Sequence, residues 1–229
     1  MEKGQLDAAA RDAALANLHV TTELADLAAC DVVIEAAFED LAVKQELFRQ
    51  LETAVRDDAI IATNTSALSV TEIASVLERP ERAVGMHFFN PAPLMPLVEI
   101  VRAERTSDDA FEAAFALGGR LGKTPIRCSD TPGFVVNRVL IPLLNDCVRV
   151  LDETGVTPDD LDAGMTRGAG WPMGPCALLD LVGLDVHVHA SEALYEKLRE
   201  PRMAPPARLA RMAQAGKLGR KRGEGFYRY

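Results

Sequence analysis

The stretch Gly85-Met86-His87-Phe88-Phe89-Asn90-Pro91 closes a short apolar run that begins at Ala83. A residue before proline is pushed towards extended geometry, and asparagine tolerates turns, so the run should end abruptly at Asn90. We therefore expect His87 to lie where a strand gives way to a loop. In parallel α/β sheets, ligands bind at that edge of the sheet.

Two further polar side chains are expected near His87. Glu99 lies inside the otherwise apolar strand Pro96-Leu97-Val98-Glu99-Ile100-Val101, and Ser66 follows the strand Ile60-Ile61-Ala62-Thr63. A lone buried charge is costly, so Glu99 needs a partner. If its strand pairs with that of His87, the carboxylate can bond one imidazole nitrogen and fix the tautomer. The other nitrogen is then left to take a proton.

Each of these residues also has a plainer interpretation. Taken alone, His87 is typical of a satisfied structural histidine, and Ser66 is as typical of a helix N-cap or turn as of a site. A Ser66–His87–Glu99 hydrolase triad is another alternative, but Asn64-Thr65-Ser66-Ala67 lacks the glycines of a nucleophile elbow.

Strands and helices alternate around this stretch. The patterns predict strands at 19–22, 31–37, 59–63, 83–89, 97–102 and 124–128, helices at 5–18, 41–56, 70–77 and 108–121, and a helical turn at 23–29. This rhythm indicates a parallel sheet with helices on both faces. The continuous β-branched run at 31–37 predicts a fully buried strand.

The rhythm breaks at Ser129-Asp130-Thr131-Pro132-Gly133, and the rest of the chain is predicted to be helical. Thr131 could cap, and Pro132 begin, a long helix that ends near Gly155. That helix is apolar on more than one face, which is typical of burial between domains or subunits. Further helices are expected at 157–167, 176–199 and 205–215. The fold class is α/β: a Rossmann-type parallel sheet domain, residues 1–130, followed by an all-helical domain, residues 131–229.

The composition excludes several classes of function. A net charge of −9 over 229 residues disfavours a general nucleic-acid surface. No apolar run approaches the roughly 20 residues that span a bilayer, and no signal peptide is evident, so we expect no membrane association. The four cysteines form no C-x-x-C, which argues against zinc and against a disulfide framework. These features favour a cytoplasmic protein without a metal.

Two positions in the helical half are also candidates. Asn137, flanked by Val136 and Val139, could turn its amide towards an interdomain cleft and hold a carbonyl oxygen, although a helix-surface amide is the plainer interpretation. His187 and His189 would point apart on a helix. We therefore expect ordinary surface histidines there rather than a metal site.

Several motifs, in register over residues 3–229, resemble the (S)-3-hydroxyacyl-CoA dehydrogenase family, with the bacterial 3-hydroxybutyryl-CoA dehydrogenases as the nearest branch. They are Asn64-Thr65-Ser66, Gly85-Met86-His87-Phe88-Phe89-Asn90-Pro91, Leu97-Val98-Glu99, Thr131-Pro132-Gly133-Phe134-Val135-Val136-Asn137-Arg138, Pro172-Met173-Gly174-Pro175 and Gly223-Glu224-Gly225-Phe226-Tyr227.

The resemblance implies interconversion of a 3-hydroxyacyl-CoA and a 3-ketoacyl-CoA with NAD, or with NADP as the alternative cofactor. In the catalytic set that it implies, His87 is the general base, Glu99 orients it, Ser66 bonds the reacting oxygen and Asn137 positions the thioester side. It implies cofactor contacts at Glu39, Lys44, Ser66, Asn90 and Lys221. It also implies a homodimer formed through the helical domain.

The chain departs from the family at its start. Family members open with a strand, a Gly-x-Gly-x-x-Gly turn and a helix, and no such turn occurs in these 229 residues. We therefore expect a truncated Rossmann domain, weakened dinucleotide binding and an open edge at strand 31–37. A late gene start, a fragment and a naturally short protein all remain open. So does a non-enzymatic remnant that binds acyl-CoA or dimerises without cofactor.

Overall fold

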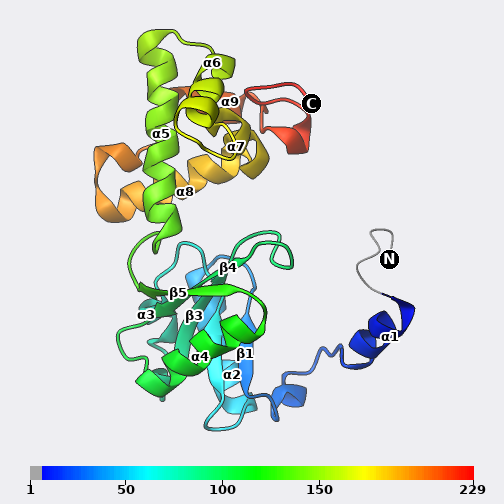
Figure 1. Ribbon diagram of the computed structural model, residues 1–229. Helices are drawn as coiled ribbons and strands as arrows, with labels where there is room; N and C mark the ends of the chain where they lie inside the picture. Colours follow the sequence, from blue (N-terminus) through cyan, green and yellow to red (C-terminus); the bar gives the residue numbers. More distant parts are fainter. Residues whose placement is uncertain (1–6) are drawn as a thin grey trace.

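The computed structural model describes residues 7–229. A five-stranded sheet with its helices forms one part of the molecule, and the long helix α5 leads from it into an all-helical part (Figure 1). The predicted fold class is confirmed in both parts. The first two residues of the helix predicted at 5–18 lie outside the described residues.

The sheet has the strand order β1-β2-β3-β4-β5. Its strands are β1 (Val32–Glu35), β2 (Ile60–Thr63), β3 (Ala83–Phe88), β4 (Leu97–Arg102) and β5 (Thr124–Ser129). The first three are parallel, whereas β4 runs antiparallel to β3, and β5 runs parallel to β4. The prediction of a wholly parallel sheet is therefore wrong at β4. Residues 89–96 join β3 to β4 without a helix, and a parallel neighbour needs a crossover of a dozen or more residues.

Helices cover both faces of the sheet, as predicted. The helices of this part are α1 (Ala8–Ala16), α2 (Leu41–Ala54), α3 (Val70–Ala74) and α4 (Asp108–Arg120). Phe48 of α2 belongs to the same core cluster as Ile61 of β2, and Phe111 of α4 belongs to a second cluster with Ile60. Successive residues of a strand point to opposite faces, so β2 is buried between the two helix layers.

Strand β1 forms an edge of the sheet. Among residues 7–229 it pairs only with β2, and Ile34 is 37% exposed. The prediction of a fully buried strand is therefore wrong, because a strand with one neighbour keeps an uncovered flank. The expected open edge at this strand is present in the described part of the chain.

The start of the described chain packs little. Asp7 caps α1 by accepting a hydrogen bond from the Ala10 amide, and no residue of α1 is buried. Figure 1 shows this helix lying away from the sheet. Residues 19–22 form no strand, so that prediction is wrong; Val20 is 99% exposed and meets no neighbouring strand. The helical turn predicted at 23–29 is confirmed as a 3₁₀ helix at Leu24–Leu27.

The second part packs its helices around α5. Its elements are α5 (Val136–Thr154), α6 (Pro158–Ala163) continued by a π-helical turn (Gly164–Gly168), α7 (Pro175–Val182), α8 (Leu184–Leu198) and α9 (Ala207–Gln214). Leu144 and Val148 of α5 share a core with Leu179 and Leu184. The single helix predicted at 176–199 is wrong, because Gly183 adopts φ 102° and ends α7 before α8 begins.

No helix among residues 7–229 is long and apolar enough to cross a membrane.

Candidate active site

His87 and Glu99 lie opposite each other in the antiparallel ladder between β3 and β4. Directly opposed residues of such a ladder have neighbouring side chains on one face of the sheet. The Nδ1 atom of His87 lies 2.7 Å from Oε2 of Glu99, and both side chains are buried. The carboxylate therefore holds the proton on Nδ1 and leaves Nε2 as the accepting nitrogen.

The second oxygen of Glu99 bonds the helical part. Its Oε1 atom accepts hydrogen bonds from the amides of Val135 and Val136, at 3.0 and 2.9 Å. Burial would raise the pKa of Glu99, but the hydrogen bonds from His87 and from these amides outweigh burial and hold the pKa below its ordinary value. Glu99 is therefore a carboxylate that bonds a strand and a helix at once.

This arrangement corrects the predicted start of the long helix. Thr131 does not cap it and Pro132 is not its first residue, because α5 begins at Val136. Gly133 and Phe134 adopt φ values of 78° and 46°, so residues 131–134 form a turn ahead of the helix. The first amides of α5 are then directed at Glu99, which takes over the capping role that was expected of a threonine.

Ser66 completes a chain of three side chains. Its Oγ lies 3.0 Å from Nε2 of His87, and because that nitrogen is the acceptor, the serine hydroxyl donates. The imidazole ring also contacts the rings of Phe89 and Phe134, with centroids 4.7 and 5.6 Å away. The apolar rings shield His87, while its reactive nitrogen is directed at Ser66.

The loop that carries Ser66 is held by Glu39. Oε1 of Glu39 accepts bonds from Thr65 Oγ1 at 2.6 Å, from Ser66 N at 2.8 Å and from Ala67 N at 3.0 Å. Burial would raise the pKa of Glu39, but these hydrogen bonds outweigh it and lower the pKa. No local sequence pattern predicts that Glu39 holds this loop.

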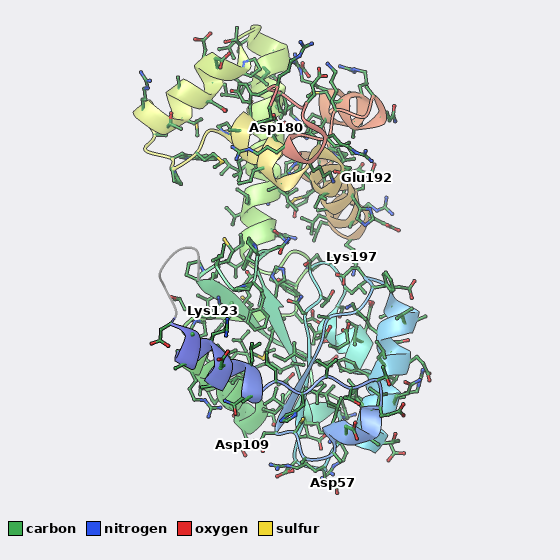
Figure 2. The ribbon with its side chains drawn as sticks, turned by 90° about the vertical axis from the view of Figure 1, so that its right-hand side faces the viewer. Asp57, Asp109, Lys123, Asp180, Glu192 and Lys197 are labelled. Carbon is green, nitrogen blue, oxygen red and sulfur yellow. The ribbon has the colours of Figure 1, made fainter. Side chains whose placement is uncertain are left out.

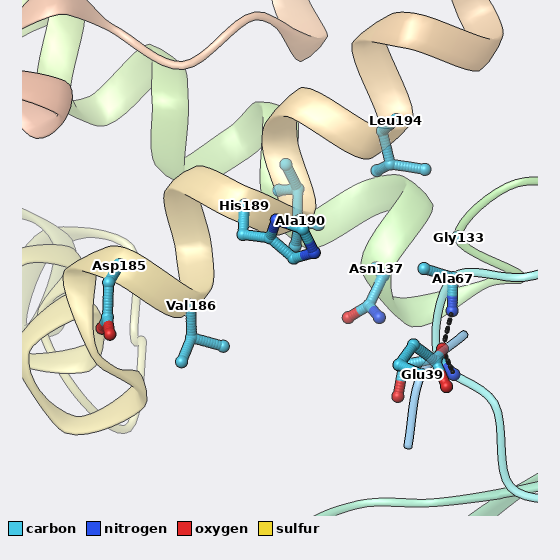
Figure 3. A pocket seen from close by; sticks show the side chains of 11 residues that line it. Glu39, Ala67, Gly133, Asn137, Asp185, Val186, His189, Ala190 and Leu194 are labelled. Atoms are coloured by element: carbon cyan, nitrogen blue, oxygen red, sulfur yellow. Dashed lines mark hydrogen bonds between the residues drawn. The ribbon is translucent and has the colours of Figure 1, made fainter. Parts of the chain in front are cut away.

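A cavity of about 350 Å³ brings several predicted residues together (Figure 3). Ser66 and Glu39 line it from the sheet part, and Asn137 lines it from α5. Helix α8 supplies the opposite wall with Asp185, Val186, His189, Ala190 and Leu194. His87 does not line the cavity itself but reaches it through Ser66. The four predicted catalytic residues are thus gathered at one cavity, with His87 and Glu99 behind its surface.

The residues with an implied cofactor role are more scattered. Lys44 is fully buried, with Nζ 2.7 Å from Glu35 and 3.4 Å from Oε2 of Glu39. Asn90 is exposed on the loop after β3. Lys123, labelled in Figure 2, donates hydrogen bonds to three carbonyl groups of that loop. Lys221 bonds Asp185 of the cavity wall.

One of the two histidines of α8 differs from the prediction. His187 is not a surface residue: it is buried, with Nε2 2.8 Å from Oδ1 of Asn145, and burial lowers its pKa to about 4. The amide of Asn145 also donates to the carbonyls of residues 202–204. A polar amide inside an apolar helix was the available signal for this cluster. His189 is exposed and faces the cavity (Figure 3).

The chain Glu99–His87–Ser66 can relay a proton at the cavity surface, and its order is also that of a hydrolase triad. An oxyanion hole in such a hydrolase needs free backbone donors beside the nucleophile. Here Glu39 occupies the amides of both Ser66 and Ala67. The arrangement therefore suits proton abstraction better than acyl transfer.

Comparison with known proteins matches the whole chain. The family model "3-hydroxyacyl-CoA dehydrogenase, NAD binding domain" matches residues 1–131, and "3-hydroxyacyl-CoA dehydrogenase, C-terminal domain" matches residues 133–229. The 3-hydroxybutyryl-CoA dehydrogenase of Clostridioides difficile is 42% identical over 227 residues, which are 99% of this chain and 81% of that protein.

Solved structures agree with this match. The crystal structures of FadB2 from Mycobacterium tuberculosis and of the (S)-3-hydroxybutyryl-CoA dehydrogenase PaaH1 from Ralstonia eutropha each superpose with a TM-score of 0.95 at 43% identity. Each comparison covers 100% of this chain and 81% of the other.

Proposed function

The chain belongs to the 3-hydroxyacyl-CoA dehydrogenase family, and we propose that it interconverts (S)-3-hydroxybutyryl-CoA and acetoacetyl-CoA with His87 as general base. It is an NAD-dependent oxidoreductase of acyl-CoA metabolism. The observation that carries the assignment of the base is the bonded chain from Glu99 through His87 to Ser66, which ends at the cavity.

In the oxidative direction, the Ser66 hydroxyl turns from Nε2 of His87 to the reacting oxygen, and Nε2 takes the proton of the substrate hydroxyl. Glu99 stabilises the imidazolium that forms, because its carboxylate already bonds Nδ1. Ser66 also hydrogen-bonds the reacting oxygen of the substrate and orients that oxygen towards His87. When NAD is bound, it supplies the acceptor for the hydride that leaves the same carbon.

Asn137 is proposed to hold the thioester carbonyl. Its side chain lies on the cavity wall that faces Glu39 and the Ser66 loop (Figure 3). An amide N–H can donate to a carbonyl oxygen, which holds the acyl group in one orientation. The apolar residues Ile141, Val186, Ala190 and Leu194 also line the cavity. Its volume of about 350 Å³ suits a short acyl chain.

The residues present fit a nicotinamide dinucleotide. Oε1 of Glu39 accepts from three donors. Within residues 7–229, Oε2 has Lys44 at 3.4 Å as its one partner and can accept a ribose hydroxyl. Ser66, Asn90 and Lys221 are the other proposed contacts. Lys44 is fully buried, so we assign it to neutralising and orienting Glu39 rather than to touching the cofactor.

The quaternary and cellular setting is also part of the proposal. Val139 and Leu143 of α5 and Leu181 and Val182 at the end of α7 are exposed apolar residues, which supports a homodimer through the helical domain, residues 131–229. All four cysteines are free, which supports a cytoplasmic location. We propose that residues 1–130 bind the cofactor.

The test uses the purified chain with NADH and acetoacetyl-CoA, followed by loss of NADH absorbance. His87→Gln should lower turnover by roughly two to four orders of magnitude, because a general base contributes about that much. His19→Gln, which changes an exposed histidine that does not line the cavity, is the matched control and should leave turnover unchanged. A near-normal rate in His87→Gln would overturn the assignment. No NADH binding at millimolar concentration would favour the non-enzymatic remnant instead.

A further inference from the structure

An ion pair borders the cavity at the start of α8. The Nζ atom of Lys221 lies 2.6 and 2.7 Å from the two carboxylate oxygens of Asp185, and Asp185 lines the cavity (Figure 3). The side chains are 44% and 42% exposed, so solvent and solutes reach both. Asp185 therefore holds the ammonium group of Lys221 beside the cavity, where another anion can still bind it.

The backbone beside the pair leaves room for it. Gly183 adopts φ +102°, and a Cβ atom there would lie 3.2 Å from Nζ of Lys221 and 3.2 Å from Oδ1 of Asp185. A side chain would be strained by that φ and would crowd the ion pair. The break between α7 and α8 thus directs Asp185 to the cavity and admits the lysine.

The tail that carries Lys221 is clamped to α7. Asp180, which is buried, accepts hydrogen bonds from the amides of Phe226 and Tyr227, each at 2.9 Å (its position is labelled in Figure 2). A Cβ atom on Gly225 would collide with the Asp180 carboxylate. The turn is therefore fitted closely against Asp180, and this contact determines where Lys221 projects.

The lining of the cavity carries negative charge, so an anionic ligand needs a cation nearby. The described lining residues include the carboxylates of Glu39 and Asp185 and neither lysine nor arginine. NADH and a coenzyme A thioester both carry a pyrophosphate, and two lining carboxylates repel it. An ammonium that can turn from a carboxylate to a phosphate oxygen would offset this repulsion.

We propose that Asp185 is a positioning residue that holds Lys221 ready for a pyrophosphate oxygen of the bound ligand and competes with that oxygen for the ammonium group. The proposal rests on the proposed function and extends it. The family resemblance implies a contact at Lys221, whereas the competing carboxylate is an inference from this structure.

Isothermal titration of the full chain with NADH, and separately with acetoacetyl-CoA, tests the proposal. Lys221→Ala should weaken the affinity for one of the two ligands roughly tenfold or more, because a charged hydrogen bond is lost. Asp185→Asn should tighten the affinity for the same ligand by roughly three- to tenfold, because the competing charge is gone while the shape is kept. The arm that responds identifies the ligand.

Lys217→Ala is the matched control, since Lys217 pairs with Glu224 in the same tail at 2.8 Å, and Glu224, unlike Asp185, does not line the cavity. It should leave both affinities unchanged. Thermal unfolding of each variant checks the fold, and Asp185→Ser removes the same charge if Asp185→Asn is unstable.

A merely structural ion pair predicts the opposite sign for Asp185→Asn. Weaker or unchanged affinity in that variant, or unchanged affinity in Lys221→Ala, would overturn the proposal. Ligand binding with these shifts but without NADH turnover would overturn the proposed function and leave this inference standing. Binding of neither ligand by the parent chain would overturn both.

Discussion

Glu99 bonds His87 across the β3–β4 ladder with one oxygen and the first amides of α5 with the other. The acid that orients the proposed base is thus also the residue that fastens the helix carrying Asn137. One carboxylate, that of Glu99, therefore both orients the proposed base and holds the start of α5 against the sheet.

Replacing Glu99 by glutamine should therefore have two effects. Without the carboxylate, the imidazolium that forms on His87 has no partner charge at Nδ1, so turnover should fall at least roughly tenfold. The weaker cap of α5 should cost about 1–2 kcal/mol of unfolding free energy. Steady-state kinetics and urea unfolding measure the two. Unchanged turnover in the variant would contradict the pairing.

The stability of the helical part should depend on pH through His187. Its pKa is lowered to about 4 by burial, so the folded state binds a proton less readily than the unfolded state, whose pKa is 6.5. The stabilisation is complete above pH 6.5 and is lost as the pH falls towards 4, by roughly 3 kcal/mol. Urea unfolding between pH 7 and 4 should show this slope, and His187→Asn should flatten it. An equal slope in that variant would refute the assignment to this histidine.

Gly225→Ala should destabilise the tail. The added Cβ collides with the carboxylate of Asp180, which holds the amides of Phe226 and Tyr227. We expect a loss of about 1–3 kcal/mol, measured by thermal or urea unfolding. Gly119→Ala is the control, because a Cβ there meets nothing within 4 Å and alanine favours the helix. Equal stability of the two variants would show that the contact is unimportant.

A charge placed on the exposed apolar face of α5 should disrupt the proposed homodimer. Val139 is 62% exposed, and Val139→Asp should dissociate the proposed homodimer, because the interface would bury an unpaired carboxylate. Light scattering coupled to size exclusion measures the mass in solution. Asp146→Asn, an exposed change on the same helix, serves as the comparison. A parent chain that is already monomeric at high concentration would contradict the dimer.

Much of the site could be anticipated from local pattern. A carboxylate inside an apolar strand required a partner, and His87 on the preceding strand was the available one; the structure pairs them. The strands themselves followed from apolar runs with clear ends. The antiparallel direction of β4 is also predictable from the sequence, because residues 89–96 are too few for a crossover connection.

The remaining contacts join residues that lie far apart in the sequence, so no local pattern predicts them. His187 was expected on the surface, since nothing near it in the chain indicates that Asn145, on another helix, covers it. Lys44 was expected to touch cofactor, yet Glu35 and Glu39 enclose its ammonium group. The Asp185–Lys221 pair joins residues of α8 and the tail, which only the folded chain brings together.

The two amides that donate to Glu99 offer an internal reporter. First-turn amides of a helix lack an intrahelical partner and exchange their hydrogens with water quickly when nothing caps them. Those of Val135 and Val136 are tied to the carboxylate that braces the imidazole. Deuterium uptake at these two positions should therefore report directly on the integrity of the Glu99–His87 pair, with no substrate present.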